Sequence, residues 1–258
     1  MFWLLPFLIA SMALADQLQV LLPVPLAARV VAGPFWNGAV VMEPFAGRKV
    51  LVTVEASLSA ASPATGPRPY AVRPSFAPCA LSDFCQMLMT LPLPWELTGV
   101  KELSPWEKLV AVSSWVSRNV RQNEHDAFPQ DAGSVLRRRE GRCSGRANLA
   151  VALLRQLGVP ARVVSGLLFS STRASWHRWG EAWMPEVGWM PFDPGVAVGV
   201  VGVRYLPMTG AGEGLPLLGI AILRLQEDEF PHLPKRSGMK LPGTLAGWKG
   251  STAWKDRL

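Results

Sequence analysis

The sequence predicts an α+β fold, with a β-rich segment followed by helices and a strand hairpin. Short Val- and Leu-rich runs, broken by Pro and Gly between residues 17 and 57, are typical of strands. Two apolar repeats at helical spacing follow, one beginning near Ser104 and one at Cys143. The chain has 258 residues, of which 49% are hydrophobic, so a packed core is expected and general disorder is excluded.

The first fifteen residues, MFWLLPFLIASMALA, form an apolar run that ends in Ala13-Leu14-Ala15. A signal peptidase cuts after such a small-x-small ending, and the run is shorter than the roughly 20 residues of a membrane span. We expect residues 1–15 to be a cleaved signal peptide and the protein to be exported, periplasmic or secreted. An uncleaved anchor or an apolar arm is the alternative, because the run lacks the usual Lys or Arg.

The first predicted helix begins after Ser104, which is an N-cap residue. Pro105 suits the first turn, and Glu107 completes a capping box. The stretch DAGSVLRRREG then predicts a short helix between an N-cap at Asp131 and a C-terminal stop at Gly141.

The stretch GRCSGRANLAVALLRQLGVPARVVSG predicts a buried helix that begins at or near Cys143. Its apolar stripe consists of Leu149, Ala150, Leu153, Leu154 and Leu157. Gly158 and Pro160 end it. The first turn of a helix presents unpaired N–H groups and about half a positive charge, which favours a thiolate over a thiol. Arg142 and Arg146 add positive charge at the same place.

The chain has three cysteines, an odd number. Cys79 and Cys85 are close enough in PCALSDFC to form a local disulfide in an oxidising compartment, which leaves Cys143 free. Two alternatives stay open: all three thiols are reduced, or Cys143 pairs with one of the others.

Only three histidines are present to accept a proton from a thiol. His125 lies in a polar segment and His232 in a Pro-flanked tail, so both are expected at the surface. His177 opens HRWGEAWMPEVGWMPFDP, which alternates at the period of a strand and turns at MPEVG. If this hairpin is centred on Pro185, His177 stands opposite Asp193, with Cβ atoms about 5 Å apart.

Cys143, His177 and Asp193 together are the set that nucleophilic acyl chemistry requires. The thiolate attacks, the histidine acts as base and later protonates the leaving group, and the carboxylate orients the histidine. One alternative is a core cysteine beside an ordinary strand histidine. Another is a zinc site, for which no CxxC or HxxxH spacing exists. No calcium-loop pattern is present, and the chemistry needs no cofactor.

These motifs resemble those of the transglutaminase-like superfamily over roughly residues 104–195. The resemblance implies a papain-like core, with the nucleophile helix packed on an antiparallel sheet. It assigns Cys143 as nucleophile, His177 as general base and acid, and Asp193 as the orienting carboxylate.

The resemblance extends to an H-x-W-x-E pattern formed with Trp179 and Glu181. Trp179 is expected to bind substrate by lining the site, with ordinary strand packing as the alternative; a surface charge is the alternative for Glu181. The backbone N–H of the nucleophile is the expected oxyanion donor. Trp106 and Trp115 are candidates for a second donor by position only, and both fit helix packing better. The acidic residue that often follows the nucleophile in the family is absent, since Ser144 comes next.

The resemblance implies an exported enzyme that attacks an amide bond, in a peptide or a glutamine side chain, and forms a thioester. Water would give hydrolysis and an amine would give acyl transfer. The residues do not choose between them, although water is the abundant acceptor unless a site excludes it. A catalytically inactive peptide-binding or envelope-structural module is the alternative, and the presence of all three triad positions counts against it.

The net charge of +7 is concentrated in two places. Six basic residues lie in residues 235–258, and five arginines precede or surround the nucleophile: Arg137, Arg138, Arg139, Arg142 and Arg146. No nucleic-acid motif accompanies them. We therefore expect a protein or peptide substrate, no nucleic-acid partner, and contact of the tail with an anionic envelope surface.

Four segments follow from these patterns. Residues 1–15 are the signal peptide, residues 16–100 a β-rich N-terminal segment with a Pro-rich strap, and residues 101–206 the transglutaminase-like catalytic core. Residues 207–258 add a C-terminal strand and the basic tail.

Overall fold

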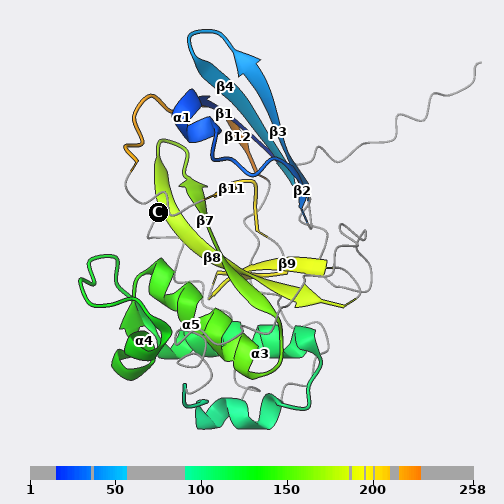
Figure 1. The fold of residues 1–258 in the computed structure, drawn as a ribbon, viewed down its shortest axis with the longest axis vertical. Coiled ribbons are helices and arrows are strands. Elements are labelled where there is room, and N and C mark those ends of the chain that lie inside the picture. The colour runs from blue at the N-terminus through cyan, green and yellow to red at the C-terminus, as the bar shows by residue number, and fades with distance from the viewer. Residues whose placement is uncertain are drawn as a thin grey trace, which may run out of the picture.

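The computed structural model describes part of the chain in detail: residues 16–35, 38–56, 91–185, 188–194, 196–199, 201–209 and 215–227. Several expectations lie outside these residues, namely the signal peptide, the Cys79–Cys85 disulfide, the Pro-rich strap, His232 and the basic tail. The described residues form two five-stranded sheets and a group of helices, with the helices at one end of the molecule and the first sheet at the other (Figure 1).

The first sheet is antiparallel and has the strand order β12-β1-β4-β3-β2. Its strands are β1 (Asp16–Pro23), β2 (Gly33–Phe35), β3 (Gly38–Phe45), β4 (Lys49–Ala56) and β12 (Ala221–Gln226). The N-terminal Val- and Leu-rich runs therefore form strands, as predicted. The run VLLPVPLAARVV is not extended throughout, because the one-turn helix α1 (Val24–Ala27) interrupts it where Pro25 cannot donate to a ladder.

The second sheet is also antiparallel, with the order β10-β9-β8-β7-β11. Its strands are β7 (Ala161–Phe169), β8 (Ala174–Met184), β9 (Gly188–Asp193), β10 (Ala197–Val198) and β11 (Tyr205–Met208). A separate parallel pair joins β5 (Arg121–Gln122) to β6 (Glu140–Gly141).

The helical end contains the 3-10 helix η1 (Trp95–Val100), α3 (Pro105–Asn119), α4 (Ala132–Arg138) and α5 (Cys143–Gln156). The capping box is confirmed, since the Ser104 side chain accepts from the N–H of Glu107 and the Glu107 carboxylate accepts from the N–H of Ser104. The N-cap at Asp131 is also confirmed. The predicted stop at Gly141 is wrong: α4 ends at Arg138, and the next residue, Arg139, takes the left-handed conformation with φ 56°.

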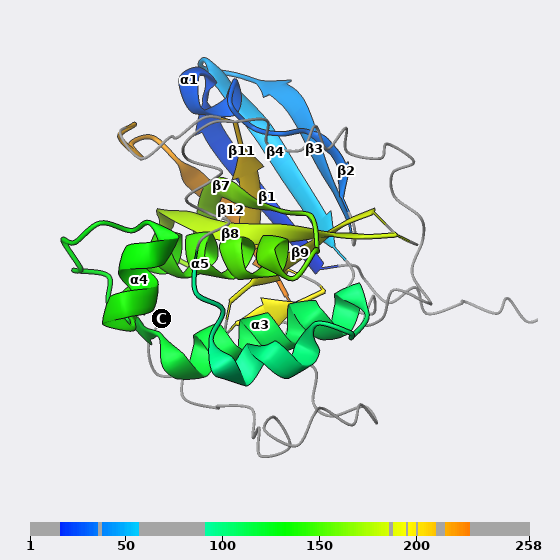
Figure 2. The same ribbon diagram turned by 60° about the horizontal axis from the view of Figure 1, so that its bottom comes forward.

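Helix α5 begins at Cys143 and packs against α3, α4, β7 and β8 (Figure 2). Its predicted stripe is buried, and so are residues on its other sides, including Ala147, Val151 and Ala152. This helix on an antiparallel sheet is the predicted α+β arrangement, and the sheet and the helix supply the two halves of the site.

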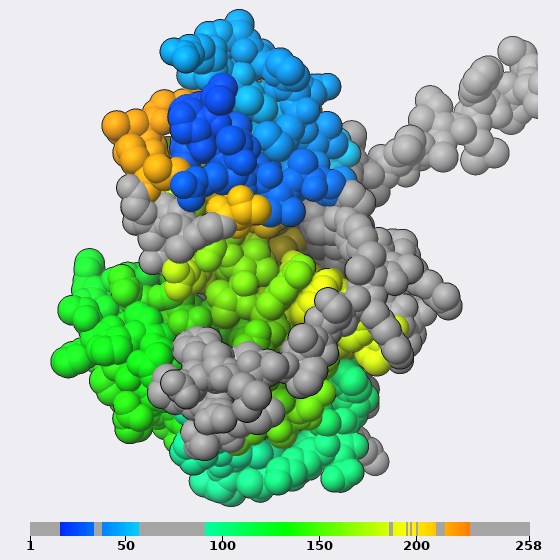
Figure 3. All heavy atoms as spheres, in the orientation of Figure 1, coloured from blue at the N-terminus to red at the C-terminus, as the bar shows by residue number. Residues whose placement is uncertain are grey.

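The long β7–β8 hairpin connects two hydrophobic cores. At one end, Leu167 and Phe169 pack with the first sheet. At the other end, Ala161 and Ala182 pack with the helices. The space-filling view shows the same arrangement, with the first sheet and the helical layer at opposite ends (Figure 3). His177 lies in the middle of the hairpin, between the two cores.

The C-terminal strand β12 pairs with β1, so it belongs to the N-terminal sheet and not to the sheet that carries His177. Strand β11 crosses the expected segment boundary after residue 206. Within the described residues, no helix has the length and apolar character needed to cross a membrane.

Candidate active site

The predicted register of the β8–β9 hairpin is wrong by two residues. The observed pairs, such as Gly180 with Phe192 and Ala182 with Met190, centre the hairpin on position 186 and not on Pro185. The turn lies where the MPEVG stretch indicated, and its centre is one residue position further along than Pro185. A shift of two preserves the face on which each side chain lies. His177 and Asp193 are therefore diagonal neighbours on one face and not directly opposite.

The structure brings Cys143, His177 and Asp193 together. The His177 Nε2 atom lies 2.7 Å from Asp193 Oδ2, and the two side chains are 12% and 7% exposed. The Cys143 side chain is half-buried and is not in a disulfide, and it lies close enough to the imidazole to raise the pKa of His177. Because Asp193 occupies Nε2, Nδ1 is the ring nitrogen left to face the thiol. The start of α5, the middle of β8 and the end of β9 thus supply the three groups.

The protonation of His177 is set by three competing effects. Burial lowers its pKa, but the Asp193 carboxylate raises it by charge and by the hydrogen bond, and Cys143 adds to the rise. Together they raise the pKa of His177 from 6.5 to about 10. The imidazolium is accordingly the dominant form at neutral pH.

Tyr205 is a member of this site that the sequence reasoning missed. Its hydroxyl donates to Asp193 Oδ2 at 2.8 Å, the same oxygen that His177 contacts. Its ring meets His177 edge-on at 5.6 Å and Trp179 at 5.3 Å, between centroids. Burial raises the pKa of Tyr205 well above 10, and Asp193 adds to the rise, so the hydroxyl keeps its proton. The chain has only two tyrosines, and Tyr205 stands in an apolar run of the sequence. That position was the one sequence feature that could have indicated a buried hydroxyl.

Trp179 packs beneath the histidine. It is 2% exposed, and its ring stacks on His177 with the centroids 6.3 Å apart and the planes at 19°. This burial favours the packing alternative over substrate lining. Gly166 on β7 allows the close approach, since a Cβ there would meet the Leu206 carbonyl oxygen at 2.1 Å and the Trp179 ring at 2.7 Å.

The other residues considered from sequence take structural roles. Trp115 is 1% exposed in the helical core, under the Arg139 guanidinium, and Trp106 packs against the same core. Glu181 pairs with Arg162 at 2.7 Å on the outer part of the hairpin. His125 is exposed, as expected.

The first turn of α5 is open. Its N-cap residue, Arg142, makes no side-chain cap hydrogen bond, whereas α3 and α4 are both capped by side chains. Gln130 instead fixes the backbone just before the helix, by accepting from the Arg142 N–H at 2.8 Å. The N-cap residue thus supplies no side-chain acceptor to the first-turn N–H groups of α5, and the N–H of Cys143 can donate to an oxyanion beside its own thiol.

Arg146 lies one turn further along α5. It is 7% exposed, and its Nη1 donates to Gln122 Oε1 at 2.5 Å. Burial lowers the pKa of Arg146, while the charges of Asp193, Glu124 and Cys143 oppose that change. The site therefore combines a buried guanidinium with the thiol, the imidazole and the carboxylate.

A metal centre receives no support from the described part of the chain, in which no three His, Cys, Asp or Glu side chains are grouped so as to hold a metal ion. What the three central groups can do together is attack a carbonyl carbon with sulfur and move a proton to or from the attacked group.

One comparison with known proteins matches the part of the chain that carries these residues to a family model. The family model of the transglutaminase-like superfamily matches residues 97–194, which include Cys143, His177 and Asp193. A comparison with curated proteins finds no match.

Solved structures with similarity to the chain include an inferred cysteine protease from Cytophaga hutchinsonii, with 14% identity, TM-score 0.44, and coverage of 86% of this chain and 90% of that one. A TGase has 14% identity and TM-score 0.32, and the match covers 65% of this chain but 45% of the TGase. The periplasmic domain of TgpA from Pseudomonas aeruginosa has 15% identity, TM-score 0.31, and coverage of 71% and 88%. Residues 97–194 of this chain form a domain of the transglutaminase-like superfamily.

Proposed function

We propose that the protein is an exported cysteine-nucleophile enzyme that acts on amide bonds, in a peptide or a glutamine side chain, through a thioester. Cys143 is the nucleophile, His177 the general acid and base, and Asp193 the carboxylate that orients it. The observation that carries this proposal is the convergence of the three side chains: the imidazole bonds Asp193 Oδ2 at 2.7 Å, and the Cys143 thiol is close enough to the imidazole to raise its pKa.

In the first half-reaction, the Cys143 thiolate attacks the amide carbonyl carbon and forms a C–S bond. The carbonyl oxygen becomes an oxyanion beside the Cys143 backbone N–H at the open end of α5. The His177 imidazolium then gives its proton to the amide nitrogen. The C–N bond breaks, the amine leaves, and a thioester and a neutral imidazole remain.

In the second half-reaction, neutral His177 removes a proton from water or from an amine as that molecule attacks the thioester. Collapse of the second tetrahedral intermediate releases the Cys143 thiolate and restores the imidazolium. Water yields a carboxylic acid, and an amine yields a new amide. Asp193 keeps Nε2 protonated throughout, so that Nδ1 is the nitrogen that exchanges protons.

An activated ester tests the proposal without knowledge of the natural substrate. With p-nitrophenyl acetate, we expect a burst of p-nitrophenol and one acetyl group on the peptide that contains Cys143. Cys143→Ala abolishes both, and His177→Ala slows them at least about 100-fold. His125→Ala is the matched control, because that histidine is exposed and lies outside the site.

Adding hydroxylamine or glycine ethyl ester then separates hydrolysis from acyl transfer, since the acetylated amine forms only if the thioester accepts a nucleophile other than water. Absence of acetyl-Cys143, or an equal burst in His177→Ala, would remove the enzyme proposal and leave a peptide-binding module in its place.

Export is the second part of the proposal. It rests on the apolar N-terminal run that ends in Ala13-Leu14-Ala15, and it predicts a mature N-terminus at Asp16. Fractionation with N-terminal sequencing tests it: a processed chain outside the cytoplasm supports export, and a full-length cytoplasmic chain contradicts it.

A further inference from the structure

Arg146 is a buried cation at the edge of the reaction centre. It follows Cys143 by three residues on α5, so the two side chains lie on the same helix face, and a helical side chain leans toward the N-terminal end. The charge of the guanidinium interacts with Cys143, Asp193 and Glu124. The guanidinium is therefore near enough to the nucleophile and to Asp193 to interact with the charges of both.

This cation has no carboxylate partner at ion-pair distance among the described residues. Its Nη1 donates only to the neutral amide oxygen of Gln122, and its Nε is buried without an acceptor in the described part of the chain. The nearby Arg138 differs, because it pairs with Asp126 at 2.6 Å. Buried guanidinium groups are normally paired, since removing a charge from water is costly.

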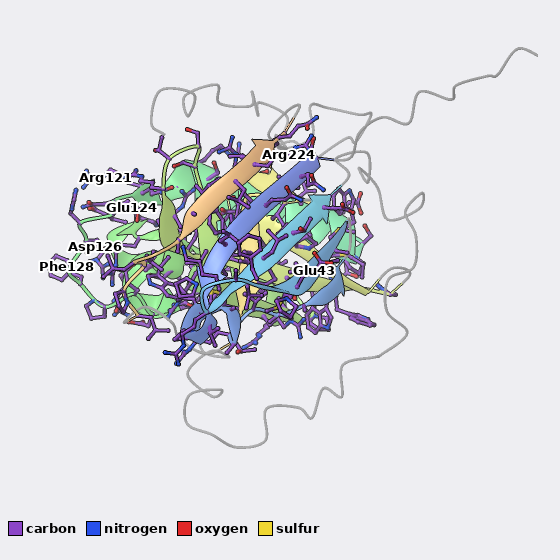
Figure 4. All side chains as sticks on the ribbon, turned by 90° about the horizontal axis from the view of Figure 1, so that it is seen from above. Glu43, Arg121, Glu124, Asp126, Phe128 and Arg224 are labelled. Atoms are coloured by element: carbon purple, nitrogen blue, oxygen red, sulfur yellow. The ribbon has the colours of Figure 1, made fainter. Side chains whose placement is uncertain are left out.

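The side chain that bonds the Arg146 guanidinium is itself exposed. Gln122 is exposed, and its Nε2 holds the exposed side chain of Glu124 at 2.5 Å. Figure 4 places Glu124 at the outer rim, on the same side as Arg121 and Asp126. A carboxylate is a stronger acceptor for a guanidinium than an amide oxygen is. Rotation of Gln122 would therefore let an incoming carboxylate replace it.

We propose that Arg146 is a carboxylate-binding subsite next to Cys143, and that the enzyme selects amides with a free carboxylate close to the scissile bond. The inference rests on the proposed function, because it takes Cys143 as the reacting group. The open start of α5 adds to the attraction for an anion at this place. A peptide C-terminal carboxylate and an acidic side chain share the required chemistry.

Competition against alkylation tests the subsite. The measured quantity is the rate of Cys143 alkylation by iodoacetamide at pH 7 and constant ionic strength, with N-acetylglycine or its neutral isostere N-acetylglycinamide as competitor. We expect N-acetylglycine to slow alkylation saturably, by at least about 5-fold, and the amide to have no effect. N-acetylaspartic acid α-amide presents the side-chain form of the carboxylate, so comparing it with N-acetylglycine shows which form is preferred.

Arg146→Met should abolish this protection, and Arg146→Lys should weaken it. The matched control is Arg155→Met, which removes one charge from the same helix about 18 Å from Cys143. The Arg155 guanidinium instead bonds the Ala161 carbonyl oxygen, so protection should persist.

Equal protection by the acid and the amide in the wild-type protein, or unchanged protection in Arg146→Met, would overturn the subsite. If Arg146→Met does not fold, the comparison of N-acetylglycine with N-acetylglycinamide in the wild-type protein decides the question alone. A separate result would contradict the proposed function itself: iodoacetamide would alkylate Cys143 equally fast in the wild-type protein and in His177→Ala.

Discussion

Asp193 Oδ2 accepts from two donors, the imidazole of His177 and the hydroxyl of Tyr205. The two donors do not contribute equally. The imidazolium brings a charge, whereas the phenol is an uncharged donor whose hydrogen bond to the carboxylate contributes about 1.5–3 kcal/mol. Tyr205 and Trp179 also enclose the imidazole, from its edge and from its face. The ring of His177 is therefore held by packing and by a hydrogen bond together.

Two substitutions separate these contributions. Asp193→Asn should lower the rate of acylation by p-nitrophenyl acetate by about 100-fold or more, because the imidazolium loses its counter-charge and the tautomer is no longer fixed. Tyr205→Phe keeps the ring and should cost about 10-fold, the equivalent of the lower end of that range. Burst kinetics measure both. A larger loss for Tyr205→Phe than for Asp193→Asn would contradict the assignment.

The raised pKa of His177 makes a signed prediction for stability. A histidine whose folded-state pKa is about 10, against 6.5 unfolded, stabilises the fold fully below pH 6.5, and the contribution is lost as pH rises through 10. The stability advantage of the wild-type protein over His177→Gln should thus shrink steadily from pH 7 to pH 10. Paired urea denaturation series measure it, and an advantage that grows over this range would refute the charge pairing.

The strand periodicity of the sequence correctly predicted that His177 and Asp193 lie together. The two-residue error in register did not change this, because a shift of two residues keeps each side chain on the same face of the sheet. Tyr205 could not be found in the same way. It reaches the site from β11, whose pairing with β7 is a contact between distant segments that no local pattern encodes.

Helices α4 and α5 approach closely at Gly145. A Cβ on this residue would lie 2.4 Å from Gln130 Oε1 and 2.7 Å from Val135 Cγ2. Gln130 is also the residue that fixes the Arg142 N–H before the nucleophile. The contact between these helices therefore bears on the position of Cys143 as well as on stability.

Gly145→Ala tests that contact. Alanine gains about 1 kcal/mol of helix propensity over glycine, but overpacking at these distances costs about 1–3 kcal/mol. We expect a net loss of stability in thermal unfolding and slower alkylation of Cys143. Gly99→Ala is the matched control, since no atom lies within 4 Å of a Cβ there. Equal melting temperatures for the two variants would contradict the account.

The positions at which helices begin were the most predictable feature of the secondary structure. Ser104, Asp131 and Cys143 each begin or cap a helix where local chemistry required it. Ends were less predictable: Arg139, not Gly141, takes the left-handed position after α4, since Gly141 is needed in β6 beside β5. A pairing between distant strands thus overrides the local stop signal.

At the scale of the whole molecule, the hairpin that carries His177 joins both cores. The first sheet contributes to one of these cores, together with Leu167 and Phe169 of β7. The N-terminal segment and the expected catalytic core should therefore unfold together. The sequence pattern, which changes from strand-like to helical at about residue 100, had suggested two separate segments.

Substitutions on β12 test this coupling. Ile222 packs against the core of the first sheet, whereas its neighbour Leu223 is 54% exposed. Ile222→Asp should cost about 2 kcal/mol, or about 4–8 °C in Tm, and Leu223→Asp should be near neutral. Loss of Cys143 reactivity should follow the same single transition. A first transition that leaves Cys143 reactive would show that the two parts unfold independently.

The pairing of β12 with β1 was beyond prediction from sequence. The two strands lie about 200 residues apart, near opposite ends of the chain, and the apolar pattern of GIAILRLQ is compatible with any free sheet edge. Only the burial of the completed first sheet selects this partner.

The most direct test of the central claim is the pH dependence of Cys143 alkylation by iodoacetamide between pH 5 and 9, in the wild-type protein and in His177→Ala, with each alkylated peptide identified by mass. The account predicts that wild-type Cys143 reacts quickly at pH 6, where an ordinary cysteine is almost entirely thiol, and that this reactivity disappears without His177. An inert Cys143, or one that reacts equally fast in both proteins, would contradict the thiolate–imidazolium centre.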